Sequence, residues 1–98
     1  MRSIIQKRKT KCFICRRNGA DDPLDEHHVY FGPYREKSEQ YGLKVYLCHD
    51  RCHIFGKRAV HRNAEVCRRV QRAVQSYAMK YYGWGYDEFI EIFGRSYL

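Results

Sequence analysis

The chain has 98 residues, the size of a single domain, and 44% of them are hydrophobic, as in a globular protein. No apolar run approaches the roughly 20 residues that span a bilayer, and residues 1–13 lack the apolar core of a secretory signal. We therefore expect a cytoplasmic protein with no membrane partner. Nineteen Lys and Arg against eleven Asp and Glu give a net charge of +8, and this excess favours a polyanion such as nucleic acid as the partner.

The basic residues are concentrated in two blocks. The first 17 residues contain seven bases and no acid, and we interpret residues 1–11 as a basic N-terminal arm ahead of a single domain over residues 12–98. The second block runs from Lys57 to Arg72. Blocks of this kind add non-specific, salt-dependent affinity for nucleic acid.

Four of the five cysteines form two pairs, one C-x2-C and one C-x3-C. These are Cys12, Cys15, Cys48 and Cys52. Because no secretion signal is visible, the pairs favour zinc over disulfides, and four thiolates suit tetrahedral Zn²⁺. Spacing alone leaves two alternatives, in which the second pair are buried thiols, or in which His49 or His53 completes the zinc site.

Secondary-structure signals after the first cysteine pair predict two strands and then helices. Residues 16–25 carry the turn signals Asn-Gly and Asp-Pro. Residues 27–31 and 43–48 have the composition of short strands, joined by a loop that has at most one helical turn near its end. Residues 49–55 suit a short helix.

A long helix and a short one are predicted to follow. Asn63 is a suitable N-cap for a helix over residues 64–82, and Gly83 suits its C-terminal end. Asp87 is expected to cap a last helix. Apolar residues at helical spacing define the face of the long helix that we expect to be buried, with Cys67 as a buried thiol beside it; they are Val66, Val70, Ala73, Val74, Tyr77, Ala78 and Tyr81. From the last helix we expect Phe89, Ile90 and Phe93 to pack on the core.

All five histidines lie between residues 27 and 61. They are His27, His28, His49, His53 and His61. Neutral imidazoles bind divalent metals, and an additional imidazole can act as a general base. The cluster therefore indicates a metal site with acid–base chemistry beside it.

These residues, taken in order, resemble the small HNH endonucleases of phages and prophages, which belong to the ββα-metal (His-Me finger) superfamily. The segments that carry the resemblance are EHHVYFG (26–32), REKSEQYGLKVYLC (35–48), CH (52–53), AVHRN (59–63) and the ending DEFIEIFGRSYL (87–98). The resemblance covers roughly residues 12–98. It implies an α+β fold with a small ββα-metal, treble-clef-like core, a structural zinc and C-terminal helices.

The resemblance also implies a function and a set of roles. The expected activity is hydrolysis of DNA phosphodiester bonds, in double-stranded DNA that is intact or nicked, by a phage- or prophage-encoded protein in a bacterial host cell. His28 matches the general base that activates water. His27 and His53 match ligands of the catalytic divalent metal (Mg²⁺, Mn²⁺, Ni²⁺ or Zn²⁺), and His61 matches a further ligand or phosphate contact. Arg35, Lys57 and Arg58 are candidates for holding the scissile strand.

Two positions depart from the family pattern. Leu43 stands where many members have Asn, so a backbone carbonyl or another side chain must orient His28. The C-x3-C spacing shifts His53 relative to the commoner C-x2-CH form, which leaves His49 as the alternative ligand. Adjacent strand residues point to opposite faces, so we expect His27 and His28 at the entry of the strand, where pleating is irregular.

A second class of function would also explain the zinc cysteines and the basic charge. It is a non-catalytic zinc-finger module that binds nucleic acid, or an adaptor that contacts phage packaging proteins. The discriminating residue is His28, because a binding module has no need of a base beside a metal ligand.

Overall fold

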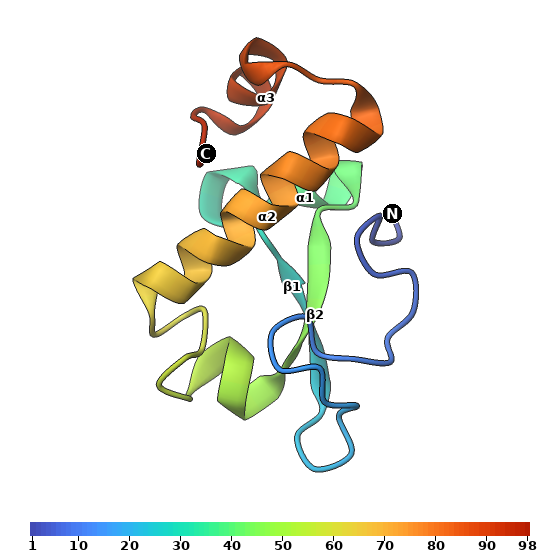
Figure 1. Cartoon of the computed structure of the whole chain (residues 1–98), viewed down its shortest axis with the longest axis vertical. Coiled ribbons are helices and arrows are strands. Elements are labelled where there is room, and N and C mark those ends of the chain that lie inside the picture. Colours follow the sequence, from blue (N-terminus) through green and yellow to red (C-terminus); the bar gives the residue numbers. More distant parts are fainter.

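Two antiparallel strands form the centre of the molecule, and the computed structural model describes all residues 1–98. The α+β class is confirmed, but the segment between the two strands, which was expected to be a loop with one helical turn, forms a 3₁₀ turn and a two-turn helix (Figure 1). The elements are β1 (Leu24–His28), the 3₁₀ turn η1 (Gly32–Tyr34), α1 (Arg35–Tyr41), β2 (Lys44–Cys48), the short helix η2 (His49–Ile54), α2 (Ala64–Tyr82) and α3 (Tyr86–Phe93).

The first strand lies three residues earlier than predicted. It pairs with β2 from Leu24 opposite Cys48 to His28 opposite Lys44, and it ends there because the Ser38 side chain takes over the backbone of Tyr30. The Ser38 hydroxyl accepts a hydrogen bond from Tyr30 N (3.0 Å) and donates one to Tyr30 O (2.6 Å). The two adjacent histidines therefore close the strand instead of opening it.

The N-terminal segment lies along β2, as Figure 1 shows. Ile4 N donates to Gly42 O (2.9 Å), and Tyr46 N donates to the side-chain oxygen of Gln6 (2.7 Å). Ser3 and Ile4 are buried. Gly42 has a positive φ of 69°, and a Cβ at this position would collide with Arg2 O, so a glycine is required where the segment crosses the end of α1.

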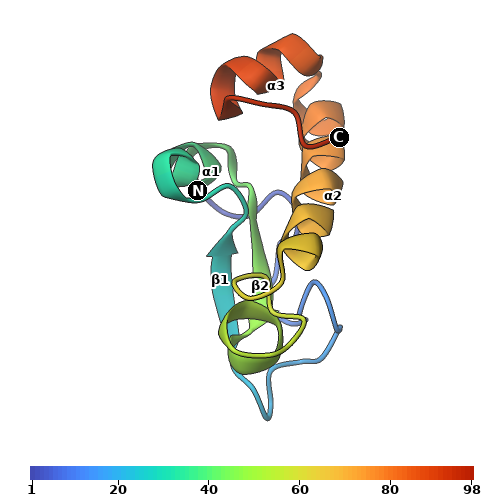
Figure 2. The ribbon, with the colours of Figure 1, turned by 90° about the vertical axis from the view of Figure 1, so that its left-hand side faces the viewer.

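The long helix α2 begins and ends as predicted. Asn63 accepts a hydrogen bond from Val66 N (3.1 Å), and Gly83 ends the helix with φ 72°. Figure 2 shows α2 and the hairpin as two layers, with η2 at one end and α3 at the other. The core fills the space between these layers.

The buried face of α2 is narrower than the sequence pattern predicted. Val70, Val74 and Ala78 are buried, but Tyr77 and Tyr81 are exposed, at 43% and 57%. Gln75 is fully buried instead, because its side chain bonds Ser96 Oγ (2.9 Å) and Tyr97 N (2.7 Å) in the C-terminal segment. The predicted Ala73 is exposed as well, so the buried face is centred on Val70, Val74, Gln75 and Ala78.

The last helix packs two of its three predicted apolar residues inward. Phe89 and Phe93 are fully buried and lie 5.5 and 4.7 Å from the Tyr30 ring, between ring centroids. Ile90 is 39% exposed, contrary to expectation. The helix begins one residue before Asp87, and its N-cap is Gly85. None of the helices combines the length and apolar character needed to cross a membrane.

Candidate metal centres

The four paired cysteines lie together, as predicted. Their sulfur atoms are all within 4.8 Å of one another, and none forms a disulfide. Cys12, Cys48 and Cys52 are buried and Cys15 is half-buried. Four thiols converging on one point form a group that can hold a metal ion, and the alternative with a histidine as fourth ligand is not needed.

Local backbone structure explains how the two pairs meet. In the first pair, Cys12 N donates to Arg17 O (2.8 Å) and Arg16 N donates to Cys12 O (3.0 Å), which closes a tight turn in which Arg16 takes a positive φ of 68°. In the second pair, Cys48 ends β2 and Cys52 follows within η2. The hairpin and a helix thus supply one side of the cluster, and the turn supplies the other.

The thiols of this cluster differ in acidity. Although burial acts in the opposite direction, backbone N–H groups of Cys15, Cys48 and Ile14 lower the pKa of Cys12 to about 7. Burial, followed by the neighbouring thiols, raises the pKa of Cys48 to about 12 and also raises that of Cys52. A cation is therefore needed before all four sulfur atoms can carry charge together.

Three histidines form a second cluster. The rings of His27, His53 and His61 lie 4.8–5.2 Å apart between centroids, and one nitrogen from each lies within 4.8 Å of the others. Burial, reinforced by the charges of the neighbouring histidines, lowers the pKa of His27 to about 3. His27 is thus neutral at pH 7, which is the form that binds a metal.

The short helix η2 brings His53 to this cluster. Both carboxylate oxygens of the buried Asp22 cap it, because they accept from Asp50 N and Arg51 N at 2.9 Å each. At the other end the helix widens, with Phe55 N and Gly56 N both donating to Asp50 O at 3.0 and 2.7 Å. This wide turn directs His53 toward β1.

A carboxylate fixes the orientation of the His53 ring. Asp25 Oδ2 accepts hydrogen bonds from Nδ1 of His53 (2.8 Å) and of His49 (2.6 Å). Although burial opposes it, hydrogen bonding to His53 and His49 lowers the pKa of Asp25, so the carboxylate accepts and both Nδ1 atoms carry hydrogen. The lone pair of His53 that remains is on Nε2, and this carboxylate–histidine arrangement is typical of metal ligands. The structure places His53 in the three-histidine cluster. His49 lies outside that cluster, but its ligand nitrogen lies within 4.8 Å of the ligand atoms of Asp25 and His53, so these three residues form another group that could hold a metal.

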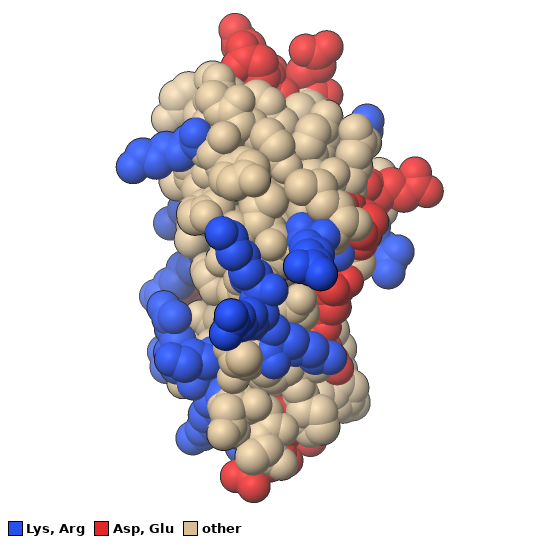
Figure 3. All heavy atoms as spheres, turned by 90° about the vertical axis from the view of Figure 1, so that its right-hand side faces the viewer, with Lys and Arg blue, Asp and Glu red and all other residues tan.

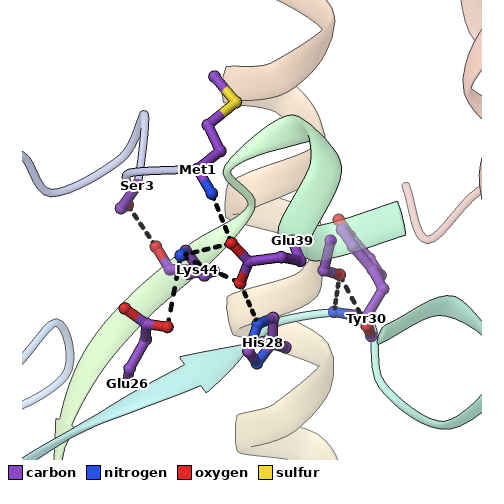
Figure 4. Close-up of polar contacts among 8 residues, drawn as sticks. Met1, Ser3, Glu26, His28, Tyr30, Glu39 and Lys44 are labelled. Carbon is purple, nitrogen blue, oxygen red and sulfur yellow. Dashed lines mark hydrogen bonds and ion pairs between the residues drawn. The ribbon is translucent and has the colours of Figure 1, made fainter. Parts of the chain in front are cut away.

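His28 is held separately by a carboxylate on α1. Its Nε2 lies 2.8 Å from Glu39 Oε1 (Figure 4). Hydrogen bonds from the Met1 amino group, His28 and Lys44 lower the pKa of Glu39 to about 2. Because the carboxylate has no proton to donate, Nε2 of His28 carries the hydrogen and its Nδ1 keeps a free lone pair.

The carboxylates around His28, Glu26 and Glu39, lie close enough to its ring to form a candidate metal group, but both are paired with a buried lysine. The buried Lys44 ammonium lies between them, 3.3 Å from Glu26 Oε1 and 3.2 Å from Glu39 Oε1 (Figure 4). A buried ammonium requires this pairing. The acids thus neutralise Lys44 and leave His28 as the only imidazole of the group.

Both adjacent histidines reach one hollow of about 280 Å³. His27, His28, His53 and His61 line it together with Glu26, Phe31 and Arg35. A hollow that is touched by residues from both faces of a strand lies at the strand's edge, and β1 has a free edge because the sheet has two strands. Joint access therefore comes from the edge of β1 and does not require the irregular strand entry that the sequence suggested.

The other predicted residues lie apart from this hollow or serve the core. Lys57 and Arg58 are exposed on the loop between η2 and α2 and do not line it. Leu43 is fully buried in the core. Cys67 is half-buried and lines a neighbouring hollow, where a fully buried thiol was expected.

Sequence reasoning missed Asp25 and Glu39. Asp25 stands two residues before His27, on the same face of a strand, and this spacing was the one available signal for it. Glu39 is one of several acids on a helical segment, and no pattern distinguishes it. Comparisons with protein-family models, curated proteins and solved structures found no match.

Proposed function

We propose that this chain is a metal-dependent HNH endonuclease that hydrolyses phosphodiester bonds in DNA. The observation that supports this most strongly is that four histidines line one hollow and that three of them are clustered while the fourth is held separately by a carboxylate. Three of them have ligand nitrogens within 4.8 Å of one another. The fourth, His28, is hydrogen-bonded to Glu39 through Nε2, which leaves its Nδ1 free to accept a proton.

The residues fit a catalytic divalent metal. His27, His53 and His61 would hold it, since His27 is neutral at pH 7 and Asp25 leaves His53 Nε2 free. Such an ion acts as a Lewis acid on the phosphate and supports the leaving oxygen. Three imidazole donors favour a transition metal such as Mn²⁺, Ni²⁺ or Zn²⁺ over Mg²⁺, which prefers oxygen.

His28 supplies the base in this proposal. Its Nδ1 accepts a proton from the attacking water, and the resulting imidazolium is stabilised by the Glu39 carboxylate on the opposite nitrogen. Arg35 lines the same hollow and would hold a non-bridging phosphate oxygen, because a guanidinium matches phosphate geometry.

The cysteine cluster would hold a structural zinc. Four thiolates and no open position are typical of a zinc that stabilises a fold, whereas a catalytic zinc keeps a position for water. The proposal thus assigns the cysteines to the fold and the histidines to the reaction. A phage or prophage setting, and contact with packaging proteins, follow from the resemblance alone.

A DNA partner is supported by the distribution of charge. Figure 3 shows Lys and Arg side chains gathered in a band across the middle of one face of the molecule, with carboxylates along one margin and at both ends. The net charge of +8 adds a sequence-independent attraction to phosphates.

The decisive experiment is cleavage of supercoiled plasmid with Mg²⁺, Mn²⁺, Ni²⁺ or EDTA. Removal of a general base costs about 10²- to 10⁴-fold in rate, so His28→Ala should lose cleavage by about that factor while keeping its melting temperature and zinc content. Glu36→Ala is the control, because Glu36 is exposed on α1, forms no ion pair and does not line the hollow. Cleavage by His28→Ala at the wild-type rate would refute the mechanism.

The basic band also favours a second candidate, a zinc-containing module that binds nucleic acid or a packaging partner without cutting. That module would bind DNA with a steep salt dependence and leave plasmid intact with every metal. The same plasmid assay, run beside a binding titration, separates the two candidates.

A further inference from the structure

A second hollow, of about 480 Å³, adjoins the one lined by the histidines. The two share Phe31 and His61 as walls. The remaining wall is formed by the start of α2 and the residues just before it, including Arg62, Arg68 and Gln71. We call this hollow the α2 groove.

The α2 groove is suited to an anionic chain. No carboxylate lines it, and Arg68 forms no ion pair, whereas its neighbour Arg69 is bound to Glu65 at 3.0 Å. Arg62 is held in place, since its guanidinium donates to Phe55 O at 2.9 Å. The positive end of the 19-residue helix adds to this potential.

Phe31 gives the groove a feature that phosphate binding does not require. Its side chain is 42% exposed, and its ring lies between the two hollows, 5.5 Å from His61 and 5.9 Å from His27 between centroids. An exposed aromatic ring among basic residues is how proteins stack the bases of single strands. Gln71 also lines the groove; its amide nitrogen donates to Val29 O at 3.5 Å, and its amide oxygen is free to accept from a base edge.

We propose that the α2 groove binds an unpaired nucleotide next to the scissile phosphate, with its base stacked on Phe31. This inference rests on the proposed nuclease function and specifies its substrate. A base in an intact duplex is stacked on its neighbours and is not available to Phe31. The preferred substrate is therefore single-stranded DNA, or DNA with an unpaired stretch at the cut.

The test is a binding titration without added divalent metal, so that cleavage does not contribute. The probes are a fluorescein-labelled 12-nucleotide single strand and the duplex of the same sequence. Wild type should bind the single strand more tightly. Phe31→Ala should weaken single-strand binding about tenfold, the effect of losing one base stack, with no change for the duplex. Phe31→Tyr should retain the wild-type affinity.

Two matched controls accompany this series. Phe55→Ala removes another exposed phenylalanine, 58% exposed, that lines neither hollow, and it should leave binding unchanged. Arg68→Gln should weaken single-strand binding, whereas Arg69→Gln should not. If Phe31→Ala does not fold, the comparison of Arg68→Gln with Arg69→Gln still tests the groove.

The results separate the inference from the proposed function. The proposed role of the α2 groove would be refuted if Phe31→Ala and Arg68→Gln both bound the single strand as tightly as wild type. It would also be refuted if these variants lost equal affinity for the single strand and for the duplex. Failure of wild type to cut any DNA would overturn the nuclease, and the binding titration does not depend on that outcome.

Discussion

Glu39 determines which nitrogen of His28 is free. The carboxylate is ionised because three hydrogen-bond donors converge on it, so it holds the imidazole hydrogen on Nε2. Asp25 does the same for the Nδ1 hydrogen of His53. Two carboxylates thus impose opposite tautomers on two histidines that line one hollow, and the opposite tautomers suit a base and a ligand respectively.

Replacement of Glu39 tests this arrangement. Glu39→Ala should lower the cleavage rate by about ten- to a hundredfold, as removal of an orienting partner of an active-site histidine does. Glu39→Gln should retain more activity, because its amide oxygen can still accept from Nε2. Nitrogen chemical shifts of the His28 ring should show a mixed tautomer in the alanine variant alone.

The control for Glu39 is an acid on the same helix. Glu36 lies in the first turn of α1, is exposed and forms no ion pair, so Glu36→Ala should cut at the wild-type rate. Equal activity of Glu39→Ala and Glu36→Ala would remove Glu39 from the mechanism.

At the scale of elements, α3 closes the end of the core that α1 and α2 leave open. Phe89 and Phe93 pack on Tyr30, and the hydroxyl of Tyr30 donates to Gln71 O in α2 at 2.6 Å. Tyr30 follows the histidine pair by two residues. The C-terminal helix therefore supports the chain segment that leaves the candidate site, although it contributes no residue to it.

Truncation of the buried ring should measure this support. Phe93→Ala should lower the free energy of unfolding by about 3–5 kcal/mol, the usual cost of removing a buried phenylalanine ring. Ile90→Ala, from the exposed side of the same helix, should cost under about 1 kcal/mol. Urea unfolding followed by circular dichroism provides the measurement, and similar losses in both variants would show that α3 does not pack as described.

The sequence patterns predicted which cysteines and histidines cluster better than they predicted which side chains hydrogen-bond to one another. The two clusters were predicted because Cys and His are scarce, and their spacing excludes most structural alternatives.

The first strand was placed too late because Ser38, ten residues downstream of His28, captures the Tyr30 backbone. Tyr77 and Tyr81 were placed in the core because periodicity does not reveal that the C-terminal segment binds Gln75. Asp25 and Glu39 gain their roles only from strand register and helix position.

At the scale of the whole molecule, the two clusters are joined through η2. Cys52 belongs to one and His53 to the other, and they are consecutive residues. The loop that follows is tied to the same point, because Val60 N donates to Cys52 O (2.8 Å) and His61 N donates to His53 O (3.1 Å). Two of the three clustered histidines, His53 and His61, are thus tied through η2 to the cysteine cluster.

Loss of the cysteine cluster should therefore abolish the fold and the histidine site together. Cys12→Ser should lose its zinc and its cooperative thermal transition, because the binding energy of a structural zinc is folding energy. Cys67→Ser, which alters the one cysteine outside the cluster, should keep both. Metal analysis and thermal unfolding are the measurements, and a Cys12→Ser protein with unchanged zinc stoichiometry would contradict the four-cysteine site.

The adjacency of Cys52 and His53 has a consequence for when the proposed nuclease would become active. If the cysteines hold zinc, a newly made chain has no nuclease centre until zinc arrives, since η2 and His53 are not yet in place. The supply of zinc would then determine when the chain becomes able to cleave DNA.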